Sequence, residues 1–233
     1  MIFTQPMISV TFQRRYKRFL TDVTTEDGQL ITVHCPNSGS MKTCQGEGWQ
    51  AYISDSQNPK RKLQYTLEMV HNGICWIGVN TQRPNEIAYE AVQEGIFASL
   101  RGLSNLRREV KYGSNSRIDL LAEDGKRKVY IEVKNVTLVE DDVYYFPDAV
   151  TTRGQKHLND LMGVVAEGHR AVMLYTIQRS DGSVFKPARH IDPAYADLLK
   201  EAIAKGVEIL PALVDVTPES LRLTGETVPY ELI

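Results

Sequence analysis

Residues 117–134 read RIDLLAEDGKRKVYIEVK, and the organisation of the whole chain follows from this stretch. Two runs of aliphatic and β-branched residues, 117–122 and 128–134, flank a polar turn that contains Asp124-Gly125. Asp-Gly between two such runs is the strongest short-range signal for a β-hairpin. The stretch therefore predicts two antiparallel strands.

The second of these strands presents an acid and a base side by side. Successive strand residues point to opposite faces, so Glu132 and Lys134 share one face. Whether Asp119 joins them depends on the register of the hairpin. A loop of even length, in which paired residue numbers sum to 249 or 251, puts Asp119 on that face, and an odd loop without a bulge turns it away. We expect the even loop.

Two carboxylates on such a strand pair form a hard oxygen site of the kind that Mg²⁺ (or Mn²⁺) prefers, with water and substrate phosphate completing the coordination. A lysine beside the metal can stabilise the charge that develops when water attacks phosphorus. The pattern of Asp119, Glu132 and Lys134 therefore indicates phosphodiester hydrolysis. The alternative is an edge hairpin whose charges are simply solvated.

The composition is that of a globular protein. A length of 233 residues suits one large or two small domains, and 42% of the residues are hydrophobic, which is enough for a packed core. The chain has no run of 18 apolar residues and no leader-like start, so we expect a cytoplasmic protein without membrane insertion. Its three cysteines form no CxxC pair and are expected to be reduced thiols.

Charge is distributed unevenly along the chain. Residues 1–84 contain nine Lys and Arg against six Asp and Glu, and the remaining residues contain 18 against 23. The first part is therefore net +3 and the second net −5. A nucleic-acid-binding surface joined to an acidic metal site would produce this asymmetry.

The first eighty residues predict a small, OB-like β-barrel. A second Asp-Gly turn, Asp27-Gly28, links a strand at 14–23 to one at 30–34. Five or so short strands with polar loops between them fit a five-stranded barrel. The further strands are expected at residues 49–54, 62–70 and 74–79.

Within this part, residues 14–19 interleave cationic and aromatic side chains. Cations neutralise phosphates and rings stack on bases, so the segment predicts a nucleic-acid surface with little sequence preference. The alternative is a solvated strand whose aromatic residues belong to the core. The residues are Arg14, Arg15, Tyr16, Lys17, Arg18 and Phe19. A loop rich in turn formers at 35–41 could in addition offer N–H groups to an anion.

Pro84 marks the expected boundary between domains 1–84 and 85–233. Asn85 is expected to cap a helix at 86–100, with Glu90 on the flank of its apolar face. Strand–helix–strand units near the end of the chain imply parallel pairing, so we expect an α/β domain with a mixed sheet. Strands are expected at 107–112, 116–122, 128–135, 170–177 and 207–214, and further helices at 152–167 and 193–205.

The start of the helix at 152–167 is suited to phosphate. Helix amino termini attract anions, and cations there oppose the dipole unless they serve an anion. The first turn therefore predicts contacts to nucleic acid, and the alternative is salt-bridging to Asp148 or Asp160. The predicted contact residues are Arg153, Gln155 and Lys156.

Six short motifs together resemble the sugar fermentation stimulation protein A family, and the opening hairpin resembles the PD-(D/E)xK nuclease core. They occur in one order along nearly the whole chain. The motifs are HCPNSG at 34–39, RID at 117–119, EVK at 132–134, FPDA at 146–149, RGQKH at 153–157 and PARH at 187–190. One position departs from the nuclease signature, because Ile118 stands where proline would precede the aspartate.

This resemblance implies an α/β protein (α+β overall) in which an OB-like β-barrel precedes a restriction-endonuclease-like mixed-sheet domain. It implies DNA binding with little sequence preference, and a regulatory link to sugar, notably maltose, utilisation. Lys134 would assist the attacking water. The metal ligands it implies are Glu90, Asp119, Glu132 and the Val133 carbonyl. The alternatives that stay open are a catalytically silent DNA-binding regulator and an RNA-binding module.

Overall fold

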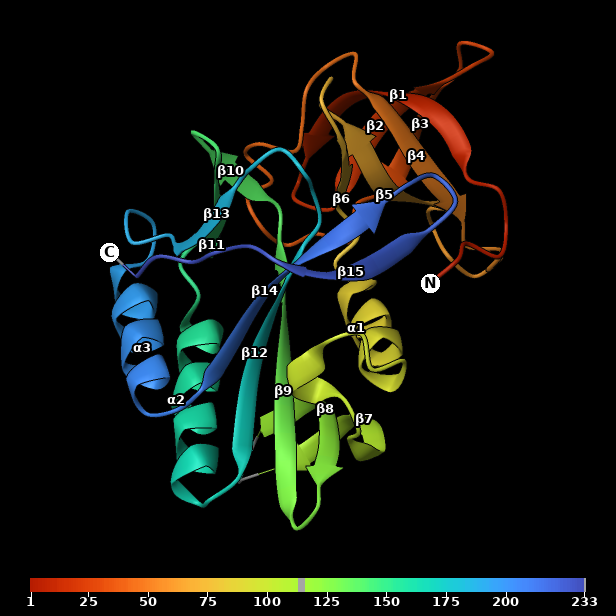
Figure 1. The fold of residues 1–233 in the computed structure, drawn as a ribbon. Helices are drawn as coiled ribbons and strands as arrows, with labels where there is room; N and C mark the ends of the chain where they lie inside the picture. The colour runs from red at the N-terminus through yellow and green to blue at the C-terminus, as the bar shows by residue number, and fades with distance from the viewer. Residues whose placement is uncertain (113–115, 233) are drawn as a thin grey trace.

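The computed structural model describes residues 1–112 and 116–232, which fold into a β-barrel and a sheet covered by helices (Figure 1). The barrel strands follow the order β3-β2-β1-β4-β5, and β3 also pairs with β5, which closes the barrel. A short β6 extends the sheet beyond β5. The expected OB-like barrel is confirmed. Its strands are β1 (Ile8–Tyr16), β2 (Leu20–Thr25), β3 (Leu30–His34), β4 (Gln50–Asp55), β5 (Tyr65–His71) and β6 (Trp76–Gly78).

Residues 14–23 do not form the single strand that the sequence predicts. β1 ends before Lys17 and Arg18, which turn the chain with φ of 47° and 65°, and β2 follows. Phe12 on β1 lies opposite Val23 on β2, and both are buried in the barrel core. Because an antiparallel pair buries both residues on one face, the chain has to reverse between them. Lys17 and Arg18 therefore lie at a hairpin turn, whereas Arg14 and Arg15 lie on β1.

The second part contains a six-stranded sheet in the order β15-β14-β12-β9-β8-β7. β12 runs parallel to β9 and β14, whereas the other neighbours are antiparallel, so the expected mixed sheet is confirmed. Its strands are β7 (Ser104–Tyr112), β8 (Ser116–Asp124), β9 (Arg127–Val136), β12 (Arg170–Ile177), β14 (Glu208–Val216) and β15 (Leu221–Thr227).

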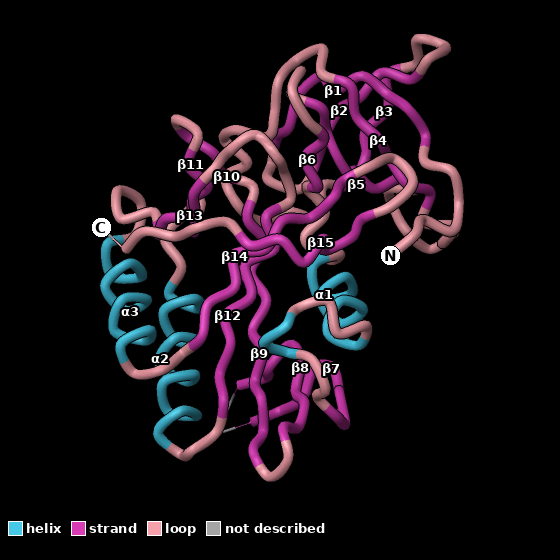
Figure 2. The backbone as a smooth tube through the Cα atoms, in the orientation of Figure 1, coloured by secondary structure: helices cyan, strands magenta, loops and turns pink. Residues whose placement is uncertain are grey.

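Helices cover both faces of this sheet (Figure 2). One face packs against α1, and the other packs against α2 and α3. In α2 the buried residues Gly154, Leu158 and Leu161 recur at three- and four-residue spacing, which forms the apolar stripe of an amphipathic helix. The helices are α1 (Pro84–Gln93), the 3-10 helix η1 (Ala98–Leu100), α2 (Thr152–Ala166) and α3 (Pro193–Ala204).

α1 is shorter than the helix expected at 86–100. It ends at Gln93, and Gly95 takes a φ of 66°, a left-handed conformation that glycine adopts at low cost. Asn85 is not the helix cap either, because Arg83 holds that position. The side chain of Asn85 is therefore available for a contact with the sheet.

A small sheet that the sequence does not predict has the strand order β10-β11-β13. It lies above α2 and α3 in the view of Figure 1. Strands of three or four residues are too short for a clear two-residue periodicity, which explains why they escape detection. They are β10 (Leu138–Glu140), β11 (Val143–Phe146) and β13 (Val184–Pro187).

A buried arginine connects the two parts. Arg179 is 2% exposed and donates to the carbonyl oxygens of Thr43 at 3.2 Å and Thr137 at 2.7 Å. Asp181 neutralises it at 2.6 Å. Since Thr43 belongs to the barrel and Thr137 follows β9, one guanidinium fixes both parts.

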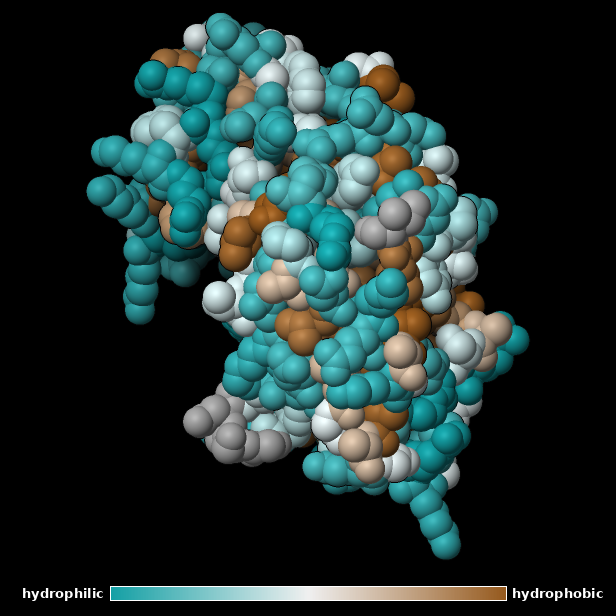
Figure 3. Space-filling model, turned by 90° about the vertical axis from the view of Figure 1, so that its left-hand side faces the viewer, coloured by the Kyte–Doolittle hydropathy of each residue, from teal (hydrophilic) through white to brown (hydrophobic). Residues whose placement is uncertain are grey.

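The outer surface is largely hydrophilic on the face shown in Figure 3, with hydrophobic residues scattered among polar ones. All three cysteines are free and buried. Within the described residues, no helix has the length and apolar character that a membrane span requires.

Candidate functional site

The register of the β8–β9 hairpin is the predicted one. Leu120 pairs with Ile131 and Asp124 with Arg127, so paired numbers sum to 251 and the loop has two residues. Continued by one position, this register brings Asp119 opposite Glu132. The two carboxylates lie 13 positions apart in the chain but on adjacent strands, and Asp119 contacts the backbone of Val133, the residue next to Glu132.

The carboxylate of Asp119 lies where the two strands separate. Backbone pairing between β8 and β9 ends at Leu120, and Asp119 Oδ2 accepts a hydrogen bond from the Val133 N–H at 2.8 Å. Its other oxygen accepts from Asn85 Nδ2, also at 2.8 Å. Burial, reinforced by the nearby charge of Glu132, raises the pKa of Asp119 despite these hydrogen bonds. A cation would relieve that unfavourable charge.

Glu132 is the most deeply buried acid of the site, at 2% exposure. Its Oε1 accepts from Lys134 Nζ at 2.6 Å and from Nδ1 of His157. Burial alone would raise the pKa of Glu132, but the hydrogen bond from His157 and the charge of Lys134 outweigh burial and lower it. The carboxylate is therefore held in its charged form.

The second oxygen of Glu132, Oε2, is buried and has no hydrogen-bond partner among the residues that the structure describes. Leaving a buried charged oxygen without a partner is costly, so native structures rarely contain one unless something else binds there. Asp119 is the neighbouring carboxylate. This pair fits a divalent cation, because Mg²⁺ is commonly held by one or two carboxylates plus water and substrate oxygens.

Glu90 does not join this pair. Its carboxylate contacts the amino group of Met1, on the flank of α1 that faces β15. Asn85, which contacts Asp119, lies five residues earlier on the helix, and five residues rotate a side chain by about 140°. Within the described residues, no three His, Cys, Asp or Glu side chains are grouped as a metal site. The three-acid set implied by the sequence is not assembled.

Sequence reasoning missed two residues that the structure brings to the site, Asn85 and His157. The signal for His157 was its place on the inward face of α2, one position before Leu158 and three after Gly154. For Asn85 no signal exists in the sequence, because its role depends on which residue caps α1.

The first turn of α2 is engaged within the protein. Thr151 caps the helix, and Gln155 donates to both carboxylate oxygens of Asp192, at 2.9 and 3.1 Å. Lys156 pairs with Asp160 at 2.7 Å, which is the salt-bridging alternative to phosphate contact. Arg153 is exposed and lies 3.4 Å from His157 Nε2. Of the predicted contacts here, Arg153 and Lys156 are exposed and Gln155 is half-buried.

The basic segment of the barrel divides into engaged and exposed residues. Tyr16 donates to Asp22, and Arg14 pairs with the same carboxylate at 2.9 Å, although its side chain is 73% exposed. Lys17 and Arg18 are exposed at the turn. Phe19 is 43% exposed beside these cations.

The side chain of Arg15 forms hydrogen bonds within the protein. Its guanidinium donates to the carbonyl oxygens of Asn37, Gly39 and Ser40, at 2.8, 3.0 and 3.2 Å, and so holds the loop at 35–41. This loop was predicted to offer N–H groups to an anion. The Met41 N–H meets the carboxylate of Asp148 from the second part of the chain, at 3.3 Å.

The fold and site together define a class: an OB-like barrel joined to a mixed-sheet α/β domain with an acidic pair and a lysine on its central hairpin. Two family models match, the SfsA N-terminal OB domain over residues 14–79 and the sugar fermentation stimulation protein RE domain over residues 82–220. The chain belongs to the sugar fermentation stimulation protein family.

Relatives of similar length support this. A sugar fermentation stimulation protein homolog of Geotalea uraniireducens is 53% identical over 221 residues, covering 95% of this chain and 96% of the relative. One from Shewanella frigidimarina is 50% identical over 228 residues, covering 97% of each. The solved structure of Pyrococcus furiosus SfsA in complex with Ca²⁺ has a TM-score of 0.88 at 26% identity, covering 99% of this chain and 98% of that one.

Proposed function

We propose that this protein binds DNA with little sequence preference and hydrolyses phosphodiester bonds at a site that takes Mg²⁺ or Mn²⁺. The observation that carries the proposal is the buried, unpartnered Oε2 of Glu132 next to Asp119, with the ammonium of Lys134 beside it. That the related Pyrococcus furiosus protein is described in complex with Ca²⁺ supports a divalent-cation site.

Asp119 and Glu132 would hold the cation, and the Val133 carbonyl stays the predicted third ligand. When bound, the cation would supply positive charge that stabilises a phosphate oxygen, and it would lower the pKa of the attacking water. Lys134 would contribute separately, through its positive charge. Its ammonium, paired with Glu132 at 2.6 Å, is a positive charge in a largely buried setting, and such a charge stabilises the negative charge that develops at phosphorus.

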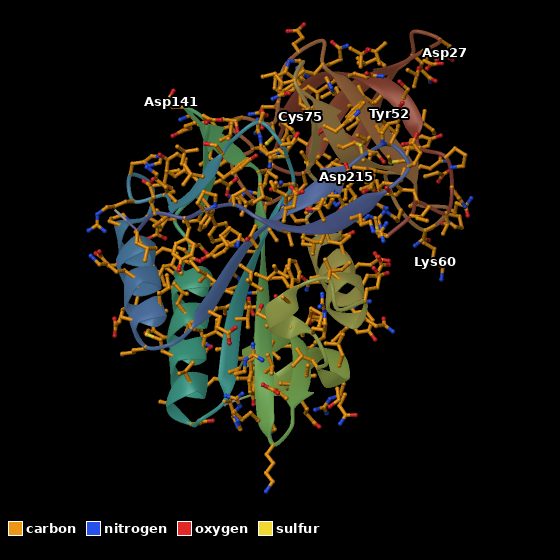
Figure 4. The ribbon with its side chains drawn as sticks, in the orientation of Figure 1. Asp27, Tyr52, Lys60, Cys75, Asp141 and Asp215 are labelled. Atoms are coloured by element: carbon orange, nitrogen blue, oxygen red, sulfur yellow. The ribbon has the colours of Figure 1, made fainter. Side chains whose placement is uncertain are left out.

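Three exposed cations, Arg14 on β1 and Lys17 and Arg18 at the turn that follows it, would contact the DNA backbone, and Phe19 would be available for stacking on a base. Lys60 also extends from a barrel loop into solvent (Figure 4). Phosphate contacts of this kind are independent of sequence. The name of the family links these proteins to sugar fermentation, and the proposed physiological role is regulation of sugar, notably maltose, metabolism through DNA.

Cleavage is tested with labelled single-stranded DNA, duplex DNA and RNA, in Mg²⁺, Mn²⁺ or EDTA. We expect metal-dependent cleavage that Lys134→Ala abolishes and that Lys200→Ala, which removes an exposed lysine on α3, leaves unchanged. Cleavage that survives in EDTA, or in the Lys134 variant, would refute the assigned site.

A second candidate function is a catalytically silent DNA-binding regulator. The observation that favours it is that Glu90 contacts Met1 and is absent from the acidic pair, so the predicted three-acid set is incomplete. The same experiment separates the two functions. DNA binding without cleavage, in every substrate and metal, selects the regulator, and binding of RNA alone selects the RNA-binding module.

Binding by the barrel turn is tested through salt dependence. Each phosphate contact contributes about 0.9 to the slope of log K against log salt for duplex DNA. The variant Arg14→Ala/Arg18→Ala should therefore flatten the slope by roughly 1–2, whereas Lys200→Ala should not change it. An unchanged slope in the double variant would place the DNA surface elsewhere.

A further inference from the structure

We propose that His157 is a positioning residue of the cation site. It occupies one oxygen of the Glu132 carboxylate and so leaves the other oxygen for a divalent cation. The inference rests on the proposed function, because it concerns the same site, and it adds a residue that the nuclease-like signature does not contain.

The hydrogen bonds define how the His157 ring is used. Nδ1 contacts Oε1 of Glu132, which can only accept, so Nδ1 carries the hydrogen. Nε2 then has a lone pair and accepts from Nε of Arg153 at 3.4 Å. Lys134 Nζ lies 3.2 Å from Nδ1 and cannot donate to a protonated nitrogen, so it donates to Glu132 at 2.6 Å.

Burial makes this arrangement rigid. His157 is 7% exposed and lies on the inward stripe of α2, and both of its ring nitrogens have partners. From the described part of the chain, Glu132 receives two donors on Oε1 and none on Oε2. When one oxygen of a carboxylate is held by hydrogen bonds, the other oxygen keeps a constant orientation. Residues that hydrogen-bond to a metal ligand raise the affinity of the site for the metal in this way.

Lys134 cannot supply this rigidity alone. Its flexible four-carbon stem allows the ammonium to move towards a substrate phosphate, and Glu132 would then lose one of its two donors. The imidazole of His157 is held by the packing of α2 and keeps the carboxylate in place. The two residues are therefore expected to act on different quantities, His157 on cation affinity and Lys134 on turnover.

Calorimetric titration of the full chain with Mn²⁺ tests the inference. His157→Leu fills the buried space without a donor and should weaken Mn²⁺ binding roughly 10- to 100-fold. His157→Asn places an N–H near the position of Nδ1 and should retain most of the affinity. His190→Ala, at an exposed histidine paired with Glu140, should leave it unchanged. Thermal unfolding without Mn²⁺ shows whether each variant folds.

The outcomes separate this inference from the proposed function. If the wild type binds no Mn²⁺, the proposed cation site is wrong and the inference falls with it. If the wild type binds and the folded His157→Leu protein binds equally well, or His157→Asn binds no better than the leucine variant, only the inference is overturned. Should His157→Leu fail to fold, Arg153→Met removes the donor to Nε2 from an exposed position and should weaken binding in the same direction; unchanged affinity there would overturn the inference.

Discussion

Asp192 connects the starts of two helices, and replacing it tests how the fold holds the candidate site. The carboxylate accepts from the Tyr195 N–H in the first turn of α3, from the Thr151 N–H at the start of α2, and from Gln155, each at 2.9 Å. Asp192 is 2% exposed. Its loss would therefore leave donors from both helices without an acceptor in a largely buried setting.

The magnitude follows from these contacts. Loss of the helix cap costs about 1 kcal/mol, and each of the two other donors left without an acceptor adds ~1 kcal/mol. Asp192→Ala should thus lower the free energy of unfolding by about 3 kcal/mol, which lowers the melting temperature of a chain of this size by roughly 6–12 °C. Asp192→Asn keeps one acceptor and should lose about half as much.

The effect should depend on pH. Burial acts to raise the pKa of Asp192, but the hydrogen bonds from Thr151, Tyr195 and Gln155 outweigh it, and the pKa in the folded protein lies below the ordinary value. A lowered folded pKa contributes stability that is present above the unfolded pKa, about 3.9, and is lost as pH falls through the folded value. The difference in stability between wild type and Asp192→Asn should therefore shrink below about pH 4.

Urea denaturation and thermal unfolding measure both effects. Asp197→Ala is the matched control, because Asp197 is a carboxylate on α3 whose ion pair with Arg189 is exposed. Its free energy of unfolding should change by less than ~0.5 kcal/mol. If Asp192→Ala lowers the free energy of unfolding no more than Asp197→Ala does, the reasoning is refuted.

Two further replacements test the contacts between the parts of the chain. Gly39→Ala would place a methyl group against the carboxylate of Asp148 and should lower the free energy of unfolding, measured by urea denaturation, by ~1–3 kcal/mol. The control is Gly163→Ala in α2, where the added methyl group meets no described atom within 4 Å and should raise the free energy of unfolding by up to ~1 kcal/mol. Equal effects of the two replacements would contradict the packing argument. Arg179→Met leaves Asp181 buried without its cation and should cost ~3–5 kcal/mol. Adding Asp181→Asn should restore part of that stability, and strictly additive losses would show that the two residues are not coupled.

The candidate site was predictable to the extent that it depends on one hairpin. An Asp-Gly turn of even length determines the register, and the register alone brings Asp119 level with Glu132. Lys134 follows from the two-residue period of the strand. These are local properties, carried by a few adjacent residues, so sequence reasoning reached them and the structure confirmed the register.

The partners of that hairpin were not predictable in the same way. The position of Glu90 depended on where α1 begins and how it is rotated against the sheet, and a side chain five residues earlier, Asn85, reached the site in its place. The basic segment at 14–19 was recognised, but the folding of β1 against β2 turned Arg15 inward to a loop of the barrel.

By itself, therefore, the sequence determined the barrel, the mixed sheet, and the acid, acid and lysine of the central hairpin. Only the tertiary structure decided that Glu132 is held through one oxygen by His157, with the other left unpartnered. The physical reason is the distance along the chain over which each kind of interaction acts. Turn chemistry and strand alternation act between residues close in the chain, whereas the rotation and packing of α1 and α2 are set by contacts across the sheet, where no local pattern records them.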